Sequence, residues 1–397
     1  MAIHLHYTDK HRALRAEIRE WLERHVPRDP LPSYDTAEGF EAHRRWEATL
    51  HSGRWSMVTW PQEYGGRGLD LIEWLIFEEE YYRVDAPGRV NQNGVFLFGP
   101  TLMEYGTSEQ KSRFLPRLAS GADIWAQVWS EPQAGSDLAA LRTTAVRDGD
   151  EYVINGHKIW STRAVYADWG FGLFRTDPQS ERHRGLSYIV VPLRTPGVTV
   201  RGIPQLDGEA GFAEIFFDNA RVPADHRIGD EGQGWSIAMA TAGFERGLML
   251  RSPARFQRTA QRLVELYRRH ATQCDPGLAA TVTQCWMDAE SYALSTYMTA
   301  SRLMAGGSIG AEASLNKIFW SELDLTMHRA ALGMLGARAE LRAAASDAAS
   351  GSLAKAADEA TRWMDGFLFS LAGPIYAGAN EIQRNIIAER VLGMPKG

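Results

Sequence analysis

The chain has 397 residues, a formal net charge of −6 and 44% hydrophobic residues. This content is typical of a folded protein, and the length exceeds what one core usually fills, so we expect two or three packed units. The charge offers no positive field for nucleic acid, and the longest apolar stretches are too short for a membrane span. No signal-peptide pattern follows Met1, and Cys274 and Cys285 are too few for a disulfide framework, so we expect a cytoplasmic protein.

The N-terminal segment, residues 1–122, has the apolar spacing of helices. Leu14, Ile18 and Leu22 recur every four residues on an otherwise charged stretch, which predicts an amphipathic helix. Another helix is expected over residues 70–83. Thr107 followed by Gln110 predicts a capping box, in which each side chain satisfies a free backbone donor at a helix start. We therefore expect an N-terminal helical domain.

The middle segment, residues 123–231, changes to the pattern of strands. Asp148-Gly149 and Asn155-Gly156 are typical of hairpin turns, because both central residues of a type I′ turn need positive φ. Nothing here alternates strand with long helix, which disfavours a doubly wound nucleotide-binding fold. We expect a central antiparallel β-barrel or sandwich, with strands near residues 152–154, 157–160, 185–191, 198–201 and 214–217.

The C-terminal segment, residues 232–397, returns to helical spacing. Gly306-Gly307 and Gly373-Pro374 interrupt it where turns are needed. Four long helices of this kind commonly form a bundle, so the expected fold class is α+β with a C-terminal four-helix bundle. The expected helices cover residues 235–270, 278–304, 311–335 and 355–370, and a last one follows residue 380.

Most sequence signatures of known sites are absent. The chain has no Gly-rich dinucleotide fingerprint, no P-loop and no serine in a nucleophile elbow, and the His4 and His6 pair at the terminus predicts no metal site. One loop stands out, residues 129–137, with sequence Trp-Ser-Glu-Pro-Gln-Ala-Gly-Ser-Asp. Its hydroxyls and backbone amides suit a phosphorylated or carbonyl-rich planar ligand. Taken alone, it is better explained as a polar turn.

Its context changes this interpretation. Six segments, in order along nearly the whole chain, resemble motifs of the acyl-CoA dehydrogenase family, and ordered motifs are far more specific than any single one. The resemblance implies flavin adenine dinucleotide (FAD) and an acyl thioester such as acyl-CoA as ligands. The six segments are residues 106–111, 129–137, 158–162, 222–223, 231–235 and 375–384.

The resemblance also implies roles for individual residues. In the family, the loop at residues 129–137 wraps the flavin ring, and the segment at residues 158–162 supplies a Trp and a Thr beside its reactive edge. Without that loop, Trp160 would be an ordinary core tryptophan. The implied cofactor-binding residues are Val128, Ser130, Ser136, Trp160, Thr162, Ala379, Asn380 and Glu381, and the implied substrate-binding residues are Ser136, Gly243, Arg246 and Gly378.

Position 377 departs from the family pattern. Ala377 stands where many members carry the glutamate that removes a proton from carbon 2 of the thioester, and alanine cannot take a proton. The resemblance implies that the backbone amide of Ala377 still donates a hydrogen bond to the thioester carbonyl. The isovaleryl-CoA and long-chain branches carry their catalytic glutamate on an earlier helix, which implies that Glu245 is the base.

The residues around Glu245 are compatible with this role. Ala238, Ala242, Glu245 and Met249 are separated by four, three and four positions, so they share one helical stripe of mostly small or apolar residues. Desolvation on such a stripe raises the pKa of a carboxyl group, as a general base requires. The stripe alone is equally consistent with a partly exposed glutamate that pairs with Arg246 or Arg251.

A second departure concerns assembly. Many family members carry an Arg-x-x-Phe element that reaches the cofactor of a neighbouring subunit. The corresponding residues 267–272 lack the phenylalanine, although Arg268 or Arg269 is available as a substitute. The resemblance implies a homodimer, homotetramer or heterotetramer, with an electron-transfer flavoprotein or a similar protein as the electron acceptor.

Three functions are therefore compatible with the sequence. The leading one is α,β-desaturation of an acyl thioester, in which a proton leaves carbon 2 and a hydride passes from carbon 3 to flavin N5. A flavin monooxygenase of the same fold needs no carboxylate base, so Glu245 counts against it. A partner subunit of a heteromeric dehydrogenase is the third possibility. The sequence leaves open the shape of the acyl group and whether its carrier is CoA or a protein.

Overall fold

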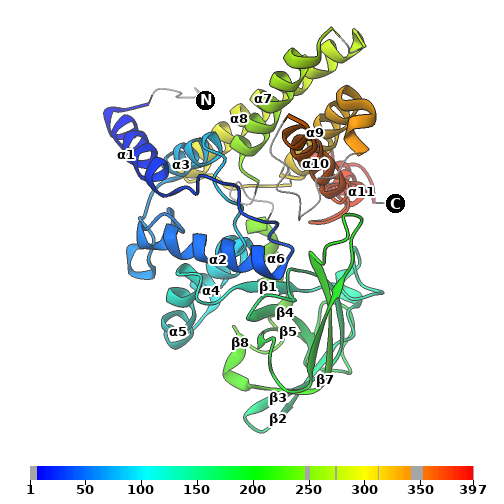
Figure 1. The fold of residues 1–397 in the computed structure, drawn as a ribbon. Coiled ribbons are helices and arrows are strands. Elements are labelled where there is room, and N and C mark those ends of the chain that lie inside the picture. Colours follow the sequence, from blue (N-terminus) through cyan, green and yellow to red (C-terminus); the bar gives the residue numbers. More distant parts are fainter. Residues whose placement is uncertain (1–6, 246–250, 273–274, 312, 341–351, 397) are drawn as a thin grey trace. The chain divides into compact units, whose positions relative to one another are not determined.

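The computed structural model describes residues 7–245, 251–272, 275–311, 313–340 and 352–396 (Figure 1). The chain forms two compact units. We call residues 14–70 and 84–250 the sheet unit, and residues 1–13, 71–83 and 251–397 the bundle unit. Within the described ranges, no helix is both long and apolar enough to cross a membrane.

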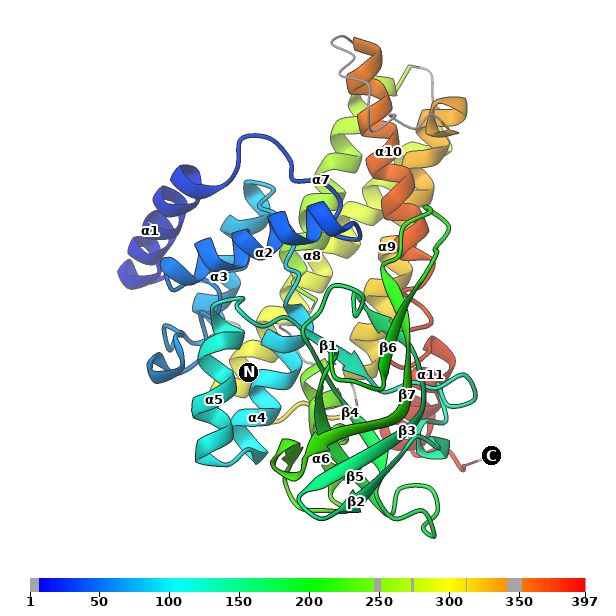
Figure 2. The ribbon, with the colours of Figure 1, turned by 60° about the horizontal axis from the view of Figure 1, so that its bottom comes forward.

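The sheet unit combines an eight-stranded sheet with helices. The strands run in the order β6-β7-β3-β2-β4-β5-β8, and β1 pairs with β4 (Figure 2). Most pairs are antiparallel, as expected, but β1 and β2 each run parallel to β4. The strands are β1 Trp125–Val128, β2 Thr144–Asp148, β3 Glu151–Thr162, β4 Trp169–Arg175, β5 Leu186–Pro192, β6 Val198–Ile203, β7 Phe212–Pro223 and β8 Arg227–Ile228.

The helices of this unit come from the first half of the chain and from its middle. The predicted capping box is confirmed, because Thr107 Oγ1 accepts from the Gln110 amide at 3.2 Å and Gln110 Oε1 accepts from the Thr107 amide at 3.0 Å. The helices are α1 Asp9–His25, which begins in the bundle unit, α2 Ala37–Ser52, α4 Gly99–Tyr105, α5 Ser108–Ala119 and α6 Gly234–Glu245.

One of the two predicted hairpin turns is wrong. Asp148-Gly149 does join β2 to β3, but Asn155-Gly156 lies inside β3, which continues to Thr162. The extra residue of a bulge lies on the opposite strand β7, where Asn219 has a φ of 50°. Asn155 Oδ1 accepts from the Asn219 amide at 2.8 Å, so the polar side chain stabilises the bulge rather than a turn.

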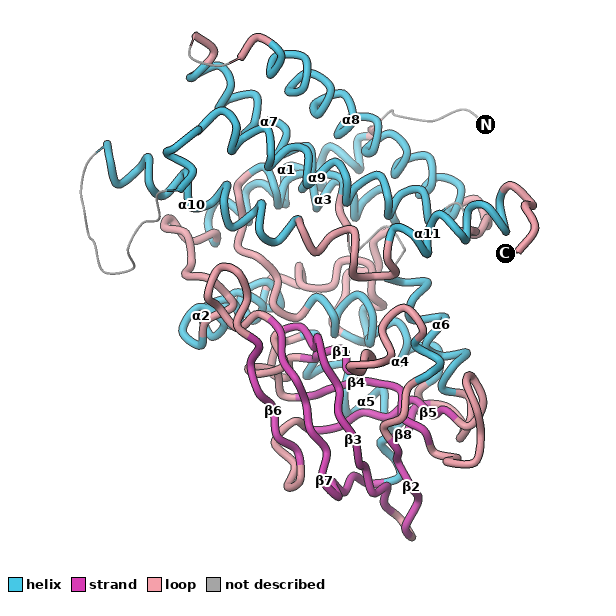
Figure 3. Tube along the Cα trace, turned by 90° about the vertical axis from the view of Figure 1, so that its right-hand side faces the viewer, coloured by secondary structure: helices cyan, strands magenta, loops and turns pink. Residues whose placement is uncertain are grey.

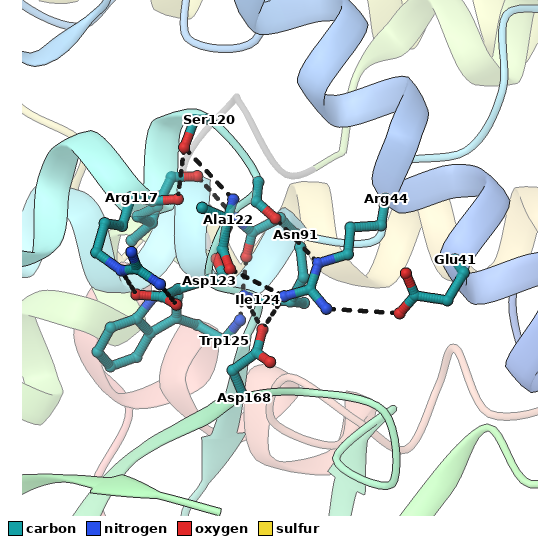
Figure 4. Close-up of polar contacts among 12 residues, drawn as sticks. Glu41, Arg44, Asn91, Arg117, Ser120, Ala122, Asp123, Ile124, Trp125 and Asp168 are labelled. Atoms are coloured by element: carbon teal, nitrogen blue, oxygen red, sulfur yellow. Dashed lines mark hydrogen bonds and ion pairs between the residues drawn. The ribbon is translucent and has the colours of Figure 1, made fainter.

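A polar network joins helices α2 and α5 to the start of β1 (Figure 4). Arg44 donates to the Gly121 and Ala122 carbonyls at 3.1 and 3.0 Å and pairs with Asp168. Asp168 also accepts from the Ile124 amide at 2.8 Å. Asn91 accepts from the Trp125 amide at 3.1 Å, so each side of β1 receives a side-chain anchor before the strand reaches the candidate site.

The bundle unit consists of long helices, as predicted, together with one earlier helix. Helices α7, α8, α9 and α10 pack side by side (Figure 3), and α3 packs against α7 and α8. The expected helix over residues 235–270 is wrong in one respect, because a new helix begins at Pro253 after Ser252. Proline lacks an amide hydrogen and favours the first helical turn. The helices are α3 Leu71–Arg83, α7 Pro253–His270, α8 Gly277–Met304, α9 Ala313–Leu335, α10 Ser352–Ser370 and α11 Asn380–Ile386.

Candidate active site

The polar loop, residues 129–137, follows β1 in the sheet unit and is held against β3. Its first turn is closed by two backbone hydrogen bonds between Glu131 and Ala134, at 3.1 and 2.9 Å. The Ser130 carbonyl accepts from the Ile159 amide of β3 at 2.9 Å. These contacts bring the loop and the segment of residues 158–162 together. Both segments are predicted to contact the same flavin ring, which requires them to be neighbours.

A buried ion pair lies beneath this junction. Lys158 is fully buried, and its Nζ donates to the Trp129 and Leu173 carbonyls at 3.0 and 2.8 Å. Its third partner is Glu131 Oε1 at 2.9 Å. Burial by itself would raise the pKa of Glu131, but the charge of Lys158 and several hydrogen bonds lower it to about 2. Glu131 is therefore a carboxylate at neutral pH.

Trp160 has an exposed side chain and a strained backbone conformation. Its side chain is 57% exposed, although most other tryptophans of the sheet unit are buried, so the ordinary core interpretation is excluded. Its φ is 61°, which is unusual for a bulky residue, and it lies in a bulge of β3 between Lys158 and Ser161. Strained, exposed aromatic residues of this kind are found at ligand sites.

The other predicted residues of the polar loop and of residues 158–162 differ in how far they are exposed. Ser130 and Thr162 are half-buried, and Ser136 is exposed. A Cβ atom placed on Gly135 would meet nothing within 4 Å. Val128 is different, because the residue is 1% exposed and its side chain lies against Gly170 of β4. An exposed ring beside hydroxyls and an open glycine fits the aromatic edge of a flavin.

Helix α6 carries two further predicted residues. Thr241 anchors the helix, since its hydroxyl lies 2.7 Å from that of Thr101 and donates to the Ile237 carbonyl at 2.9 Å. Gly243 is exposed, and a Cβ atom there would meet nothing within 4 Å. Glu245 is the last residue of α6, but its side chain and all of Arg246 lie outside the described residues.

The remaining predicted residues lie in the bundle unit, on the turn of residues 373–381 before and into α11. Ala377 has a φ of 56° and Gly378 a φ of 81°, so two successive residues are left-handed. Successive turns of this type aim backbone amides into a common concavity that suits an anion or a carbonyl oxygen. Ala379 precedes α11 as its capping residue, and Glu381 is exposed in the first turn of that helix.

A buried lysine holds this turn in place. Lys317 of α9 donates to the Gly373 carbonyl at 2.9 Å and to Asn380 Oδ1 at 2.8 Å. The Asn380 side chain also contacts the Ser321 hydroxyl at 3.2 Å, and its amide donates to the Pro374 carbonyl at 2.8 Å, so the residue is engaged inside the unit. Gln383 donates to the Gly378 carbonyl at 3.2 Å.

Sequence reasoning missed the roles of Glu131, Lys158 and Lys317. One signal was available for Lys158, because Tyr152, Ile154 and Lys158 fall at even spacing along β3 and face the core together. A lysine at an inward strand position requires a buried anion as its partner. Nothing in the spacing of α9 distinguishes Lys317 from a surface lysine.

Comparison with known proteins identifies the class to which this geometry belongs. Three family models match in order, namely the N-terminal domain of acyl-CoA dehydrogenase over residues 8–122, the middle domain over residues 126–220 and the C-terminal domain over residues 232–392. The chain belongs to the acyl-CoA dehydrogenase family. It is therefore an oxidoreductase of a flavoprotein family that dehydrogenates acyl-CoA.

Individual relatives match over almost their full length. Acyl-CoA dehydrogenase IpdE1 of Mycobacterium tuberculosis is 40% identical and covers 96% of this chain and 97% of its own. Among solved structures, the Tcur3481-Tcur3483 steroid ACAD has a TM-score of 0.84 at 29% identity and full coverage of both chains. The ChsE4-ChsE5 complex of M. tuberculosis has a TM-score of 0.80 at 32% identity, covering 99% of this chain and 100% of the other.

Proposed function

We propose that the chain uses FAD to introduce an α,β double bond into an acyl-CoA, with Glu245 as the base. The observation that carries the proposal is the wall formed by Trp160, Ser130 and Thr162, with an exposed aromatic ring beside half-buried hydroxyls. Bound FAD supplies the acceptor for the hydride from carbon 3. The residues proposed to hold it are Val128, Ser130, Ser136, Trp160, Thr162, Ala379, Asn380 and Glu381.

Glu245 is proposed to take the proton from carbon 2. Support comes from helix α6, where Ala238 is fully buried and Ala242 packs against the core. Position 245 continues this stripe by helical spacing, so a carboxylate there begins close to apolar surroundings. Lower solvation raises the pKa of a carboxyl group toward the working pH of a general base.

Ala377 is proposed to act through its backbone amide, which donates to the thioester carbonyl as negative charge develops there. Its left-handed φ of 56° supports this role, because an alanine gains nothing locally from that conformation. Ser136, Gly243, Arg246 and Gly378 are proposed to contact the acyl-CoA. Gly243 supports this set, since the absence of a side chain leaves open space beside it.

The substrate is proposed to be a bulky, steroid-derived acyl-CoA, as the printed name of the steroid ACAD suggests for that relative. Ala377 is consistent with this choice, because a methyl group occupies less of the site than a glutamate. The chain is also proposed to work as an oligomer, homomeric or heteromeric, and the ChsE4-ChsE5 complex is one relative formed by two different chains. An electron-transfer flavoprotein in the cytoplasm is the proposed acceptor.

Anaerobic mixing with a panel of acyl-CoAs tests the proposal. The purified protein should be yellow, with about one FAD per chain, and a steroid-derived acyl-CoA should bleach the flavin faster than straight-chain or branched ones. Bleaching by straight-chain substrates alone would overturn the steroid assignment and leave the desaturase. A flavin that no acyl-CoA bleaches, in a protein that forms oligomers only with a homologous chain, would favour the partner-subunit alternative.

A further inference from the structure

The inference concerns how the flavin wall keeps its shape, and it rests on the proposed function. The residues on both sides of Ser130 in the sequence are held by the same lysine. The carbonyl of the preceding residue, Trp129, is held by Lys158 Nζ, and the following residue, Glu131, pairs with the same ammonium group. The Ser130 carbonyl itself accepts from Ile159, the neighbour of Lys158. Lys158 and its neighbour Ile159 therefore hold three consecutive loop residues.

The Glu131 carboxylate extends this control to a second segment. Its oxygens accept from the Arg142 amide at 2.6 Å, the Thr143 amide at 2.9 Å and Gln133 Nε2 at 2.7 Å. Glu131, near the start of the polar loop, is consequently tied both to Lys158 and to the backbone of residues 142–143. Every hydrogen of the ammonium group and both carboxylate oxygens are satisfied, which keeps the network rigid.

Stability alone does not explain such a pair. Desolvation of two charges offsets most of their attraction, and well-packed apolar residues often serve a fold equally well. The location of the pair suggests another purpose, because Lys158 lies two positions before Trp160, whose φ of 61° must be held by its surroundings. Ser130 is adjacent to Glu131 and Trp160 lies two positions after Lys158, so a proposed contact of the flavin ring lies close to the pair on each segment.

We propose that Lys158 and Glu131 are positioning residues, which fix the Ser130 backbone and the Trp160 bulge in the geometry that the flavin ring requires. Neither touches the reacting atoms in this account. Site geometry held by a supporting shell is lost when that shell is removed, even where the fold survives. The proposal therefore separates affinity for the flavin from stability of the protein.

Lys158→Met and Glu131→Gln test this, because each keeps most of the volume of the side chain. The matched control is Glu47→Gln, another buried carboxylate of the sheet unit, which accepts from Arg89 at 2.8 Å and from the Asn91 amide at 3.2 Å. The flavin is removed from each protein, FAD is titrated back by fluorescence quenching, and the visible spectrum of the bound flavin and the urea midpoint of the apoprotein are measured.

We expect both test variants to bind FAD about 10- to 100-fold more weakly and to blunt the fine structure of its visible spectrum. Glu47→Gln should lower the urea midpoint yet retain wild-type FAD affinity and spectrum. Wild-type affinity and spectrum in both test variants would overturn the proposal, and so would an equal loss in Glu47→Gln. If Lys158→Met does not fold, Glu131→Gln decides alone. Wild-type protein that takes up no FAD would instead refute the proposed function.

Discussion

At the scale of single residues, backbone strain marks the candidate site more clearly than charge does. Among the residues that the structure describes, seven non-glycine residues have positive φ, including Trp160 and Ala377. Both occupy positions that the family motifs had indicated, one in the sheet unit and one in the bundle unit. A conformation that costs free energy persists where the surrounding contacts hold it, here a bulge for Trp160 and the Lys317 contacts to the turn of Ala377.

Ala377→Gly should stabilise the protein. The left-handed conformation costs a residue with a Cβ atom roughly 1–2 kcal/mol, whereas glycine adds about 0.5–1 kcal/mol of unfolded-state entropy, so we expect a net gain of about 0.5–1 kcal/mol. Gly378→Ala is the control with the opposite sign, because the φ of 81° at this position strains any residue with a Cβ atom. Urea unfolding measures both, and a less stable Ala377→Gly would show that Ala377 is not strained.

At the scale of elements, the sequence predicted the order of helices, strands and helices, because periodicity is a local property. The capping box of Thr107 was predictable for the same reason. Two details of the elements could not be predicted from the sequence. Asn155-Gly156 has the composition of a turn, but the partner strand β7 supplies a bulge that absorbs it, and Pro253 begins a helix inside a continuous apolar pattern.

The candidate site shows the same division between local and distant information. Ordered motifs indicated the polar loop, Trp160 and the turn at Ala377, and the structure places the first two against each other within the sheet unit. The contacts that hold them come from residues distant in sequence, such as Glu131 with Lys158 and Gly373 with Lys317. Such pairs depend on tertiary packing, which no spacing along the chain encodes. The role of Glu245 stays a prediction.

At the scale of the whole molecule, each unit contains a buried histidine with a lowered pKa. Burial lowers the pKa of His226 in the sheet unit, and the nearby charge of Arg113 adds to the effect. Burial also lowers the pKa of His328 in the bundle unit, against the opposing charge of Asp324. Both imidazoles are thus preferentially neutral in the folded protein.

This predicts a loss of stability in mild acid. A histidine whose folded pKa lies below its unfolded value of about 6.5 contributes stability that is complete above that pH and is lost as the pH falls. Each such group contributes a slope of up to about 1.4 kcal/mol per pH unit. Urea unfolding between pH 7 and pH 5 should show this slope, flattened in a His226→Gln variant. An unchanged slope would contradict the assignment of His226.

The central claim is that this family member uses Glu245 in place of a base at position 377. The variant that tests it is Glu245→Gln, which keeps the shape of the side chain and removes its proton affinity. The matched control is Glu38→Gln on the exposed first turn of α2. Both proteins should keep wild-type FAD content and far-ultraviolet circular dichroism. Any difference in their rates of flavin reduction then reflects the proton-transfer step.

The decisive measurement is the rate at which a substrate acyl-CoA bleaches the flavin under anaerobic stopped-flow conditions. We predict that Glu245→Gln slows this rate by roughly 10²–10⁴-fold, the usual contribution of a positioned general base, while Glu38→Gln reacts as the wild type does. Flavin bleaching in Glu245→Gln at a rate close to that of the wild type would contradict this prediction. It would show that Glu245 is not the base and that another residue takes the proton.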